Sequence, residues 1–414
     1  MSSNKIELLS PVGSYESLAA AIQAGANSVY FGVEQLNMRA RSNINFTLDD
    51  LQKIADSCKE HSVKSYLTLN TIVFDHDISL MKKIMDSAKE QGIDAIIATD
   101  HAVLNYAKKI QIHAHISTQS NITNIDTIEF FSTYSDVMVL ARELSLTQVS
   151  EIIREIKRRK ITGPSGKLVR IEIFGHGALC MAVSGKCYLS LHSNFASANR
   201  GACIQNCRKS YIVTDKEDGV ELEIDNEYIM SAKDLCTIDF LDKIIKAGVS
   251  VLKIEGRGRS ADYVSIVTKC YREAIDACHE KSYSQEKISE WKTRLATVYN
   301  RGFWEGYYLG RTMGEWSNEY GSKASKRKIL IGKGLRYFKE VNVGEFQLAS
   351  HSLSVGDEIL ITGPTTGVVQ TTVQEIRLDD LKVETVKKGA IFTIHLEEQI
   401  RPSDKLFKWV AAND

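Results

Sequence analysis

The chain has 414 residues, with 52 basic (Lys and Arg) and 52 acidic (Asp and Glu) side chains and a formal net charge of +0. Its 43% hydrophobic and 25% charged residues exclude disordered, collagen-like and membrane-embedded proteins. Neutrality excludes a surface that is cationic overall, so a nucleic-acid partner would need a local basic patch. The N-terminal segment lacks the apolar core of a signal peptide, and no apolar run reaches membrane-spanning length. We therefore expect a cytoplasmic protein without a membrane partner.

Short apolar, β-branched runs alternate with amphipathic segments over residues 1–280. The runs are typical of buried strands, and the amphipathic segments have the period of helices. Eight strands joined by helices predict an α/β fold, a (β/α)8 TIM-like barrel, with an open doubly wound sheet as the alternative. The predicted strands are Ile6–Leu9, Ser28–Gly32, Lys64–Asn70, Ala95–Thr99, Ile112–Ser117, Asp136–Leu140, Val169–Phe174 and Val251–Glu255.

Polar residues follow these strands, at the end of a barrel where active sites lie. Arginine forks there would suit a dicarboxylate ligand, although salt bridges that close the barrel would use the same residues. We treat Arg142, Glu255 and Arg257 as candidate catalytic residues, together with Lys233 in the segment SAKDLC. The residues of this kind that face the predicted barrel mouth are Asn70, Gln119, Arg142, Glu143, Glu255 and Arg257, and His176 follows the seventh strand.

An insertion at residues 175–250, before the last strand, interrupts the alternation. A long loop inside a compact domain needs something to order it. Thiolates in a reducing compartment bind zinc or iron–sulfur clusters, and four suffice for either. The spacing differs from that of a compact CxxC zinc ribbon, which favours iron–sulfur and leaves zinc, or no metal, as alternatives. Five of the eight cysteines lie in the insertion, namely Cys180, Cys187, Cys203, Cys207 and Cys236.

The remaining sequence predicts a helical, then aromatic-rich connector at 281–325. Short alternating runs from 326 to 414 predict a small C-terminal β-barrel domain. Two basic runs could contact RNA phosphates, with Trp304, Tyr307 and Tyr308 as stacking surfaces, although such runs are commonly solvated helix faces. The runs are Lys323, Lys326, Arg327, Lys328, Lys333 and Arg336 at the domain junction, and Arg154, Lys157, Arg158, Arg159 and Lys160 in a predicted helix.

The segment Glu172–Ser190 reads EIFGHGALCMAVSGKCYLS. It resembles the signature of the collagenase-like peptidase family, with Glu, Phe, Gly, Cys and Ser where that pattern requires them. The resemblance covers nearly the whole chain, through ELLSPVGSYESLAAAIQAGANSVYFG, ANRGACIQNCRKSY, KIEGRGRSADYV and RPSDKLFK. A match of this length indicates the family and leaves the substrate open.

The resemblance implies an activity beyond the peptidase name. Bacterial members with a barrel and a C-terminal β domain support oxygen-independent hydroxylation: prephenate-dependent formation of 5-hydroxyuridine in tRNA, formation of 5-hydroxycytidine in ribosomal RNA, or hydroxylation of ubiquinone. Ubiquinone-type members carry a four-iron, four-sulfur (4Fe-4S) cluster and imply a related partner subunit. On this basis we expect Cys180, Cys187, Cys203 and Cys207 to bind a 4Fe-4S cluster, with Cys236 in reserve. Prephenate would be the donor and tRNA the favoured substrate, with ribosomal RNA as the alternative.

The family name makes proteolysis a further alternative. The sequence has no HExxH, GxSxG or Cys-Gly-Ser-Cys-Trp element that would mark a metal-bound water or an activated nucleophile. A thiol peptidase would need Cys180 or Cys187 as nucleophile with His176 as base. His176 is equally a candidate acid–base group beside a cluster. Cluster chemistry explains four cysteines together, whereas proteolysis explains one.

Overall fold

Eight parallel strands form the barrel, and the structure, a computed structural model, describes residues 6–40, 45–212, 228–310 and 314–413. The strands are β1 (Glu7–Pro11), β2 (Ser28–Phe31), β3 (Lys64–Leu69), β4 (Ala95–Ala98), β5 (His113–Ile116), β6 (Val137–Val139), β7 (Arg170–Gly177) and β9 (Val251–Ile254). The ring closes because β9 pairs with both β7 and β1. The predicted barrel is therefore confirmed and the open sheet is wrong, since an open sheet leaves two edge strands unpaired.

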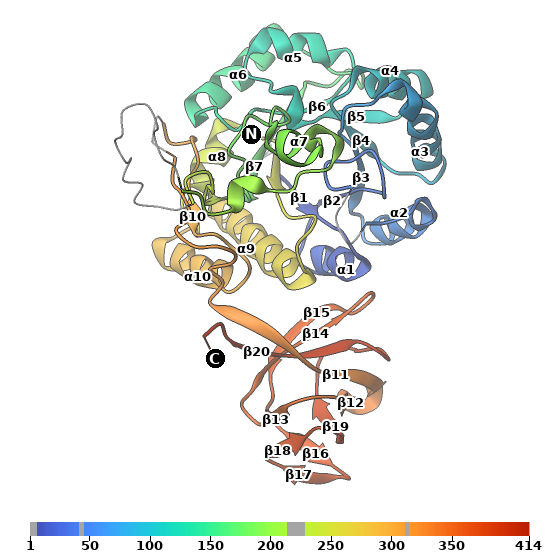
Figure 1. Ribbon diagram of the computed structural model, residues 1–414, viewed down its shortest axis with the longest axis vertical. Coiled ribbons are helices and arrows are strands. Elements are labelled where there is room, and N and C mark those ends of the chain that lie inside the picture. The colour runs from blue at the N-terminus through green and yellow to red at the C-terminus, as the bar shows by residue number, and fades with distance from the viewer. Residues whose placement is uncertain (1–5, 41–44, 213–227, 311–313, 414) are drawn as a thin grey trace.

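Helices surround the barrel, as Figure 1 shows. Ser145 caps α6 by accepting a hydrogen bond from the Gln148 backbone N–H, and four buried aliphatic side chains form the inner face of this helix. None of the helices in the described ranges is both long and apolar enough to cross a bilayer. The helices that precede or follow barrel strands are α1 (Tyr15–Gln23), α2 (Leu51–Glu60), α3 (Ile78–Glu90), α4 (His101–Ile110), α5 (Ile125–Ser132), α6 (Leu146–Arg159), α8 (Leu241–Ala247) and α9 (Ala261–His279).

Alternate residues of each strand point into the barrel or out toward the helices. In β1, Leu9 belongs to an interior cluster with Tyr30, Tyr66 and Val137, whereas Leu8 packs in the core between sheet and helices. Burial of both faces explains why the strands read as nearly continuous apolar runs in the sequence.

Charged side chains complete the barrel interior in ion pairs. Glu7 accepts hydrogen bonds from Arg170 and Tyr66, each at 2.6 Å. Burial alone would raise the pKa of Glu7, but Arg170 and Tyr66 lower it to about 2. Nearer the carboxyl ends of the strands, the Lys253 ammonium donates to Glu172 at 2.8 Å, and both side chains are buried. Such pairing makes buried charge tolerable.

The connection between β7 and β9 crosses the mouth of the barrel. It contains α7 (Leu189–Asn194), which lies in front of the barrel centre in Figure 1, and β8 (Asp234–Cys236), which pairs antiparallel with the end of β7. Arg208 donates to the carbonyl oxygens of Leu179, at 2.6 Å, and Ala232. These bonds tie the start of the insertion to its end, so the insertion has an ordered protein framework of its own.

After α9 the chain forms α10 (Gln285–Ala296) and β10 (Phe303–Trp304), which pairs with β8 outside the closed ring. The C-terminal strands are β11 (Lys326–Phe338), β12 (Val343–Leu348), β13 (Ser352–Ser354), β14 (Glu358–Gly363), β15 (Gly367–Thr372), β16 (Ile376–Leu378), β17 (Leu381–Val383), β18 (Thr385–Lys387), β19 (Ile391–His395) and β20 (Lys405–Ala411).

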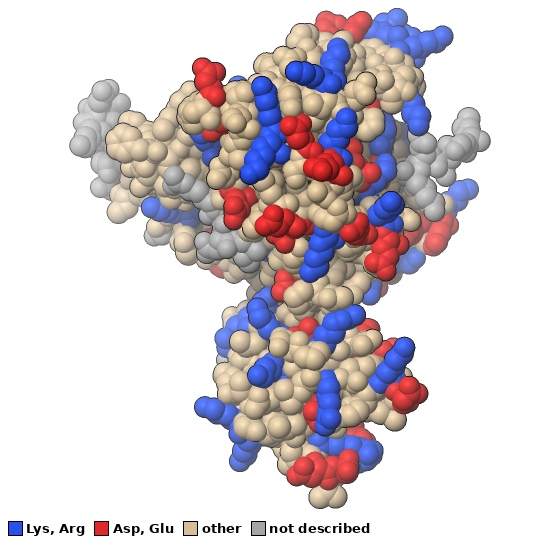
Figure 2. All heavy atoms as spheres, turned by 90° about the vertical axis from the view of Figure 1, so that its right-hand side faces the viewer, with Lys and Arg blue, Asp and Glu red and all other residues tan. Residues whose placement is uncertain are grey.

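The C-terminal region, predicted as a small β-barrel domain, forms an antiparallel sheet, so its β structure is confirmed. Eight strands pair in the order β15-β14-β20-β11-β12-β19-β16-β17 around a core that includes Phe346 and Phe392, and β13 pairs with β18. The Gln23 side chain on α1 donates to the Thr366 carbonyl oxygen at 2.9 Å, so the sheet contacts the barrel through its β14–β15 turn. Figure 2 shows a wide upper lobe and a smaller lower one, with basic and acidic side chains interspersed on the visible face.

Replacing Glu7 by Gln tests the buried pair at the base of the barrel. The folded pKa of Glu7 lies below its usual value of 4.5, so the carboxylate stabilises the fold above pH 4.5 and this contribution is lost as the pH falls toward 2. We expect E7Q to lower the free energy of unfolding by about 2–3 kcal/mol at pH 7, measured by urea denaturation. Its stability should also change less than that of the wild type between pH 4.5 and 2.

Glu60→Gln is the control, because Glu60 is exposed at the end of α2. An acid dependence that is identical in E7Q and the wild type would show that Glu7 does not stabilise the barrel.

Candidate functional site

A cavity of about 200 Å³ lies at the mouth of the barrel, between the carboxyl ends of the strands and the insertion. Tyr30, Thr68 and Lys253 reach it from the strands, and Cys180 and Cys203 reach it from the insertion. This is where barrel enzymes place their active sites. Glu143 is exposed beside it and does not contribute to the lining. Five residues predicted from strand ends do line the cavity: Asn70, Gln119, Arg142, Glu255 and Arg257.

Basic side chains outnumber carboxylates in this cavity. Seven lining residues are Lys or Arg, and Glu255 alone is acidic. Three of the seven are in ion pairs at 2.8–3.3 Å, and the other four have no ion pair among the described residues. The surplus positive charge suits an anionic ligand. The paired cations are Arg39 (with Glu255), Lys253 (with Glu172) and Arg301 (with Asp234), and the unpaired ones are Arg142, Arg208, Arg257 and Arg259.

Arg142 is fixed in the cavity wall by contacts that leave a buried N–H donor without an acceptor. Its guanidinium lies 3.8 Å from the ring centre of Phe174, and Nη1 donates to the Ala178 carbonyl oxygen at 2.9 Å. Its Nε is buried and has no acceptor among the described residues. A buried donor without an acceptor is costly, so this atom marks a position that an oxygen of a ligand would satisfy.

Glu255 orients the arginines around it. Burial would raise the pKa of Glu255, but the guanidinium groups of Arg39, Arg259 and Arg142 lower it. A carboxylate with a lowered pKa is a weak proton acceptor, and the 3.0 Å ion pair with Arg39 holds that side chain over the cavity. Arg257 donates to the Thr68 hydroxyl, and burial lowers its pKa to about 10, so it remains charged at neutral pH.

The four predicted cluster ligands gather at the rim of this cavity. Cys180, Cys203 and Cys207 line it, and Cys187 is close enough to interact electrostatically with Cys207. Burial raises the pKa of the Cys207 thiol, the Arg208 guanidinium opposes this rise, and the other three thiols add to it. Crowded thiolates repel one another, and a cationic metal group relieves that repulsion.

The donor set at the rim consists of four cysteine thiols. Within the described ranges, no three His, Cys, Asp or Glu side chains converge closely enough to hold one metal ion. Zinc needs its sulfur ligands about 2.3 Å from one centre, whereas cysteines around a four-iron cluster bind different irons and lie further apart. Four thiols are the donor set of an iron–sulfur cluster and also of structural zinc, so the residues present fit either group.

Cys236, the reserve ligand, lies apart from the other four cysteines. It is 3% exposed on β8, and its Sγ lies 3.8 Å from the Tyr271 hydroxyl. Burial raises the pKa of its thiol to about 11, and it does not line the cavity. This is the environment of a core cysteine.

His176 and Lys233 also lie outside the cavity lining. His176 is 2% exposed, packs against Tyr263 and Tyr271, and its Nδ1 lies 3.3 Å from the Tyr271 hydroxyl. Burial lowers its pKa to about 3, which makes it a poor base at neutral pH. Lys233 is in a 2.5 Å ion pair with Glu315. Neither side chain is placed to act on a ligand in the cavity.

Five of the eleven cations in the two basic runs are in ion pairs within the protein. At the domain junction, Lys326, Lys328 and Arg336 form ion pairs at 2.5–2.9 Å. On α6, Arg158 and Arg159 pair with carboxylates of α5 and α6. Paired cations at a surface contribute little to phosphate binding, because a phosphate would have to displace their carboxylates.

The stacking role predicted for Trp304 and Tyr308 is wrong. These side chains are 3% and 4% exposed and belong to the barrel core, and the Tyr308 hydroxyl donates to the Phe174 carbonyl oxygen at 2.9 Å. Tyr307 is partly buried against Trp304. The aromatic faces of Trp304 and Tyr308 are therefore not available to bases.

Four lining arginines escaped the sequence analysis. Arg208 directly follows a cluster cysteine and Arg259 lies two residues after Arg257. Both arginines could therefore have been predicted from their positions beside predicted site residues. Arg39 follows β2 in a loop and Arg301 follows α10, and their approach to the cavity depends on tertiary packing.

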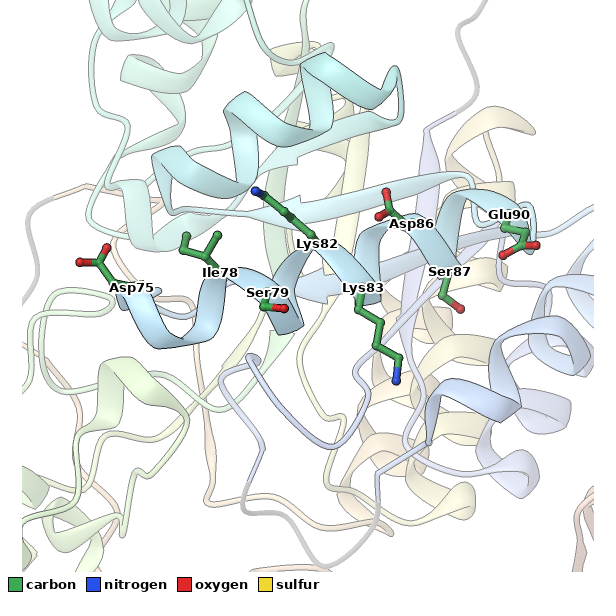
Figure 3. Close-up of a pocket in the computed structure, with 8 residues that line it drawn as sticks. All are labelled: Asp75, Ile78, Ser79, Lys82, Lys83, Asp86, Ser87 and Glu90. Atoms are coloured by element: carbon green, nitrogen blue, oxygen red, sulfur yellow. The ribbon is translucent and has the colours of Figure 1, made fainter.

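A larger groove, of about 840 Å³, runs along α3 (Figure 3). It is lined by both acidic and basic side chains, and Figure 3 shows Lys82 and Lys83 pointing in different directions. No set of groups converges there, so we interpret it as a solvated helix face.

Comparison with known proteins shows the family to which the chain belongs. A model of peptidase family U32 matches residues 13–318. The chain belongs to this family. It is 55% identical to a collagenase of Porphyromonas gingivalis, over 99% of each chain. The solved U32 peptidase Mk0906 covers 62% of this chain and 95% of its own, at 11% identity and a TM-score of 0.39.

Other members carry names from RNA modification. The chain is 34% identical to tRNA hydroxylation protein P of Helicobacter pylori, over 74% of this chain and 72% of that one. It is also 34% identical to a 23S rRNA 5-hydroxycytidine synthase of Escherichia coli, over 71% of this chain and 43% of that one. The expected family is thus confirmed, and its members are named both as peptidases and as RNA hydroxylation proteins.

Alkylation rates test the separation of the rim cysteines from Cys236. In protein stripped of metal, iodoacetamide at pH 8 should label the exposed Cys180 and Cys203 fastest, and Cys207 more slowly because its thiol pKa is raised. Cys236, buried and with a pKa of about 11, should react at least about tenfold more slowly than Cys180, as measured by peptide mass spectrometry. Equal labelling of Cys180 and Cys236 would contradict the two environments.

Proposed function

We propose that this protein carries out oxygen-independent hydroxylation of a pyrimidine base in RNA, with tRNA as the favoured substrate. The observation that carries the proposal is the meeting of four cysteines with an arginine-rich cavity at the barrel mouth. Relatives named for tRNA and 23S rRNA hydroxylation, at 28–34% identity, support it. An RNA substrate and unpaired thiols are both in keeping with the cytoplasm.

Cys180, Cys187, Cys203 and Cys207 would hold a 4Fe-4S cluster at the rim of the cavity. When bound, such a cluster supplies one-electron transfer. Arg208 favours the thiolate form of Cys207, since its guanidinium opposes the effect of burial on that thiol. The insertion covers the site, which limits the access of water to the ligand beneath it.

The unpaired arginines would bind the hydroxyl donor, a small carboxylic acid for which the family resemblance implies prephenate. Arg binds carboxylates through paired N–H donors, and the buried Nε of Arg142 lacks an acceptor within the described residues. Arg257, which follows the end of β9, presents a second charge to the same cavity. The cavity, at about 200 Å³, lies below the roughly 300–1,000 Å³ of typical ligand pockets, so it suits a small acid or a single base.

The target base would have to leave its stack to approach this cavity. Unstacking costs a few kcal/mol in a duplex and least in a single-stranded loop, which favours a loop nucleotide as substrate. Asn70, Ser117 and Gln119 line the same cavity and offer amide and hydroxyl groups for the hydrogen-bonding edge of a base.

Proteolysis is the second candidate, because two Porphyromonas gingivalis relatives at 55% and 49% identity are named collagenase. The available pair is Cys187 with His192, which line one exposed apolar groove. His176 is unsuited as the base because it is buried and its pKa is low. A single thiol–imidazole pair leaves the other three rim cysteines and the unpaired arginines without a role.

Metal analysis tests the cluster. Protein purified without oxygen should be brown and contain iron and acid-labile sulfide, and Cys187→Ala or Cys203→Ala should lose both while retaining the far-UV spectrum of the fold. Cys236→Ala is the matched control and should keep its iron, because Cys236 lies outside the cavity lining. A colourless, zinc-loaded protein, or equal loss of iron in C236A, would refute this ligand set.

Nucleoside analysis tests the substrate. A strain that lacks the gene should lose 5-hydroxyuridine derivatives from tRNA, and the wild-type protein should restore them. Arg142→Ala should reduce this restoration by about tenfold or more, since it removes charged hydrogen bonds to the donor. Arg158→Ala is the control, because Arg158 lies on the solvent face of α6, and this variant should restore the modified nucleosides fully.

Loss of 5-hydroxycytidine from ribosomal RNA in place of the tRNA nucleoside would select the alternative substrate. Unchanged hydroxypyrimidines in both RNAs, together with gelatin cleavage that disappears in Cys187→Ala, would establish the peptidase.

A further inference from the structure

Exposed apolar side chains are concentrated on the cysteine-rich insertion. Eight of the 20 large apolar side chains that are exposed in the described part of the chain lie between residues 181 and 212. Tyr188 is 72% exposed and Phe195 is 94% exposed, and they flank α7 at its two ends. An apolar concentration of this kind marks an interaction surface. We call Tyr188, Phe195 and the groove between Cys187 and His192 the insertion platform.

The insertion platform is fixed in position by polar contacts beneath it. Ser190 of α7 is 2% exposed, and its hydroxyl accepts from the Ile204 backbone N–H at 3.0 Å. Asn206 donates to the Ser193 hydroxyl at 2.5 Å. Phe195 ends α7 with φ of 51°, in the left-handed region, and this conformation directs its ring into solvent. These bonds hold α7 in place, and the two rings at its ends remain exposed although folding them inward would have buried apolar area.

The charge of the same segment favours a polyanion as its occupant. Residues 177–212 contain four Lys or Arg and no Asp or Glu, in a chain whose total charge is balanced. Lys186 and Lys209 are exposed, and neither has an ion pair among the described residues. The platform adjoins the barrel-mouth cavity, because Cys187 lies in the platform groove and Gly185 in the cavity lining.

We propose that the insertion platform binds the single-stranded RNA nucleotides that flank the modified base. This inference rests on the RNA hydroxylation proposed above and names the surface that would hold the substrate. Bases stack on the faces of Tyr188 and Phe195, and Lys186 and Lys209 contact phosphates. The target base then enters the cavity between the flanking nucleotides. Single-stranded nucleic acids bind to surfaces that combine exposed aromatic rings with cations and lack acidic side chains.

RNA binding by the full-length protein tests the platform. The probe is a 17-nucleotide tRNA anticodon stem-loop with a fluorescent end, titrated anaerobically at several salt concentrations. Tyr188→Ala with Phe195→Ala should raise the Kd by about tenfold or more and leave the salt dependence unchanged. Lys186→Ala with Lys209→Ala should reduce the slope of log Kd against log salt by roughly 0.7 per lysine. Phe130→Ala is the matched control, because Phe130 is 58% exposed on the outer helix α5.

The outcomes separate this inference from the proposed function. If Y188A/F195A binds the stem-loop like the wild type while the wild type still restores RNA hydroxylation, the platform is overturned and the function stands. If the wild type binds no RNA and restores no modified nucleoside, both the RNA-binding platform and the proposed function are contradicted. A dimer of the wild type that Y188A/F195A converts to monomer in sedimentation, with unchanged RNA affinity, would assign the platform to protein association and overturn the inference.

Discussion

The arrangement of the site depends on the closure of the barrel, in which β9 pairs with both β7 and β1. Because all barrel strands run in parallel, the chain leaves β7 at the mouth and must return to the opposite end of the barrel before β9 can begin. The segment between them therefore starts over the mouth, and its first part carries the rim cysteines. Closure of the ring is thus what places four thiols above the polar ends of the strands.

Within this frame the distribution of charge decides what the site can bind. Charged side chains elsewhere inside the barrel are balanced by ion pairs, such as Arg170 with Glu7 and Lys253 with Glu172. The mouth is the exception, where four guanidinium groups have no carboxylate partner among the described residues and one buried donor has no acceptor. Desolvated cations without counter-charges lower stability, and a bound anion would recover that free energy. The same sign of charge continues onto residues 177–212 of the insertion, which contain four Lys or Arg and no Asp or Glu.

Much of this could be predicted from the sequence, and the exceptions have physical causes. All eight strands were predicted because fully buried parallel strands read as apolar runs, and Arg142, Glu255 and Arg257 were predicted from their positions at strand ends. His176 was expected at the mouth, two residues after Phe174, but an irregularity in the β7–β9 register between these residues turns it against Tyr271 of α9. The exposure of Phe195 and the burial of Trp304 both depend on tertiary packing, which local pattern does not encode.

The central claim is that an iron–sulfur cluster on the rim cysteines adjoins a cavity that binds a carboxylate donor. Electron paramagnetic resonance of the anaerobically purified, dithionite-reduced protein tests it directly, recorded with and without prephenate. We predict a cluster signal whose g values shift on addition of prephenate in the wild type and remain unchanged in Arg142→Ala. A wild-type spectrum that prephenate does not alter, or a reduced protein without any cluster signal, would contradict the account.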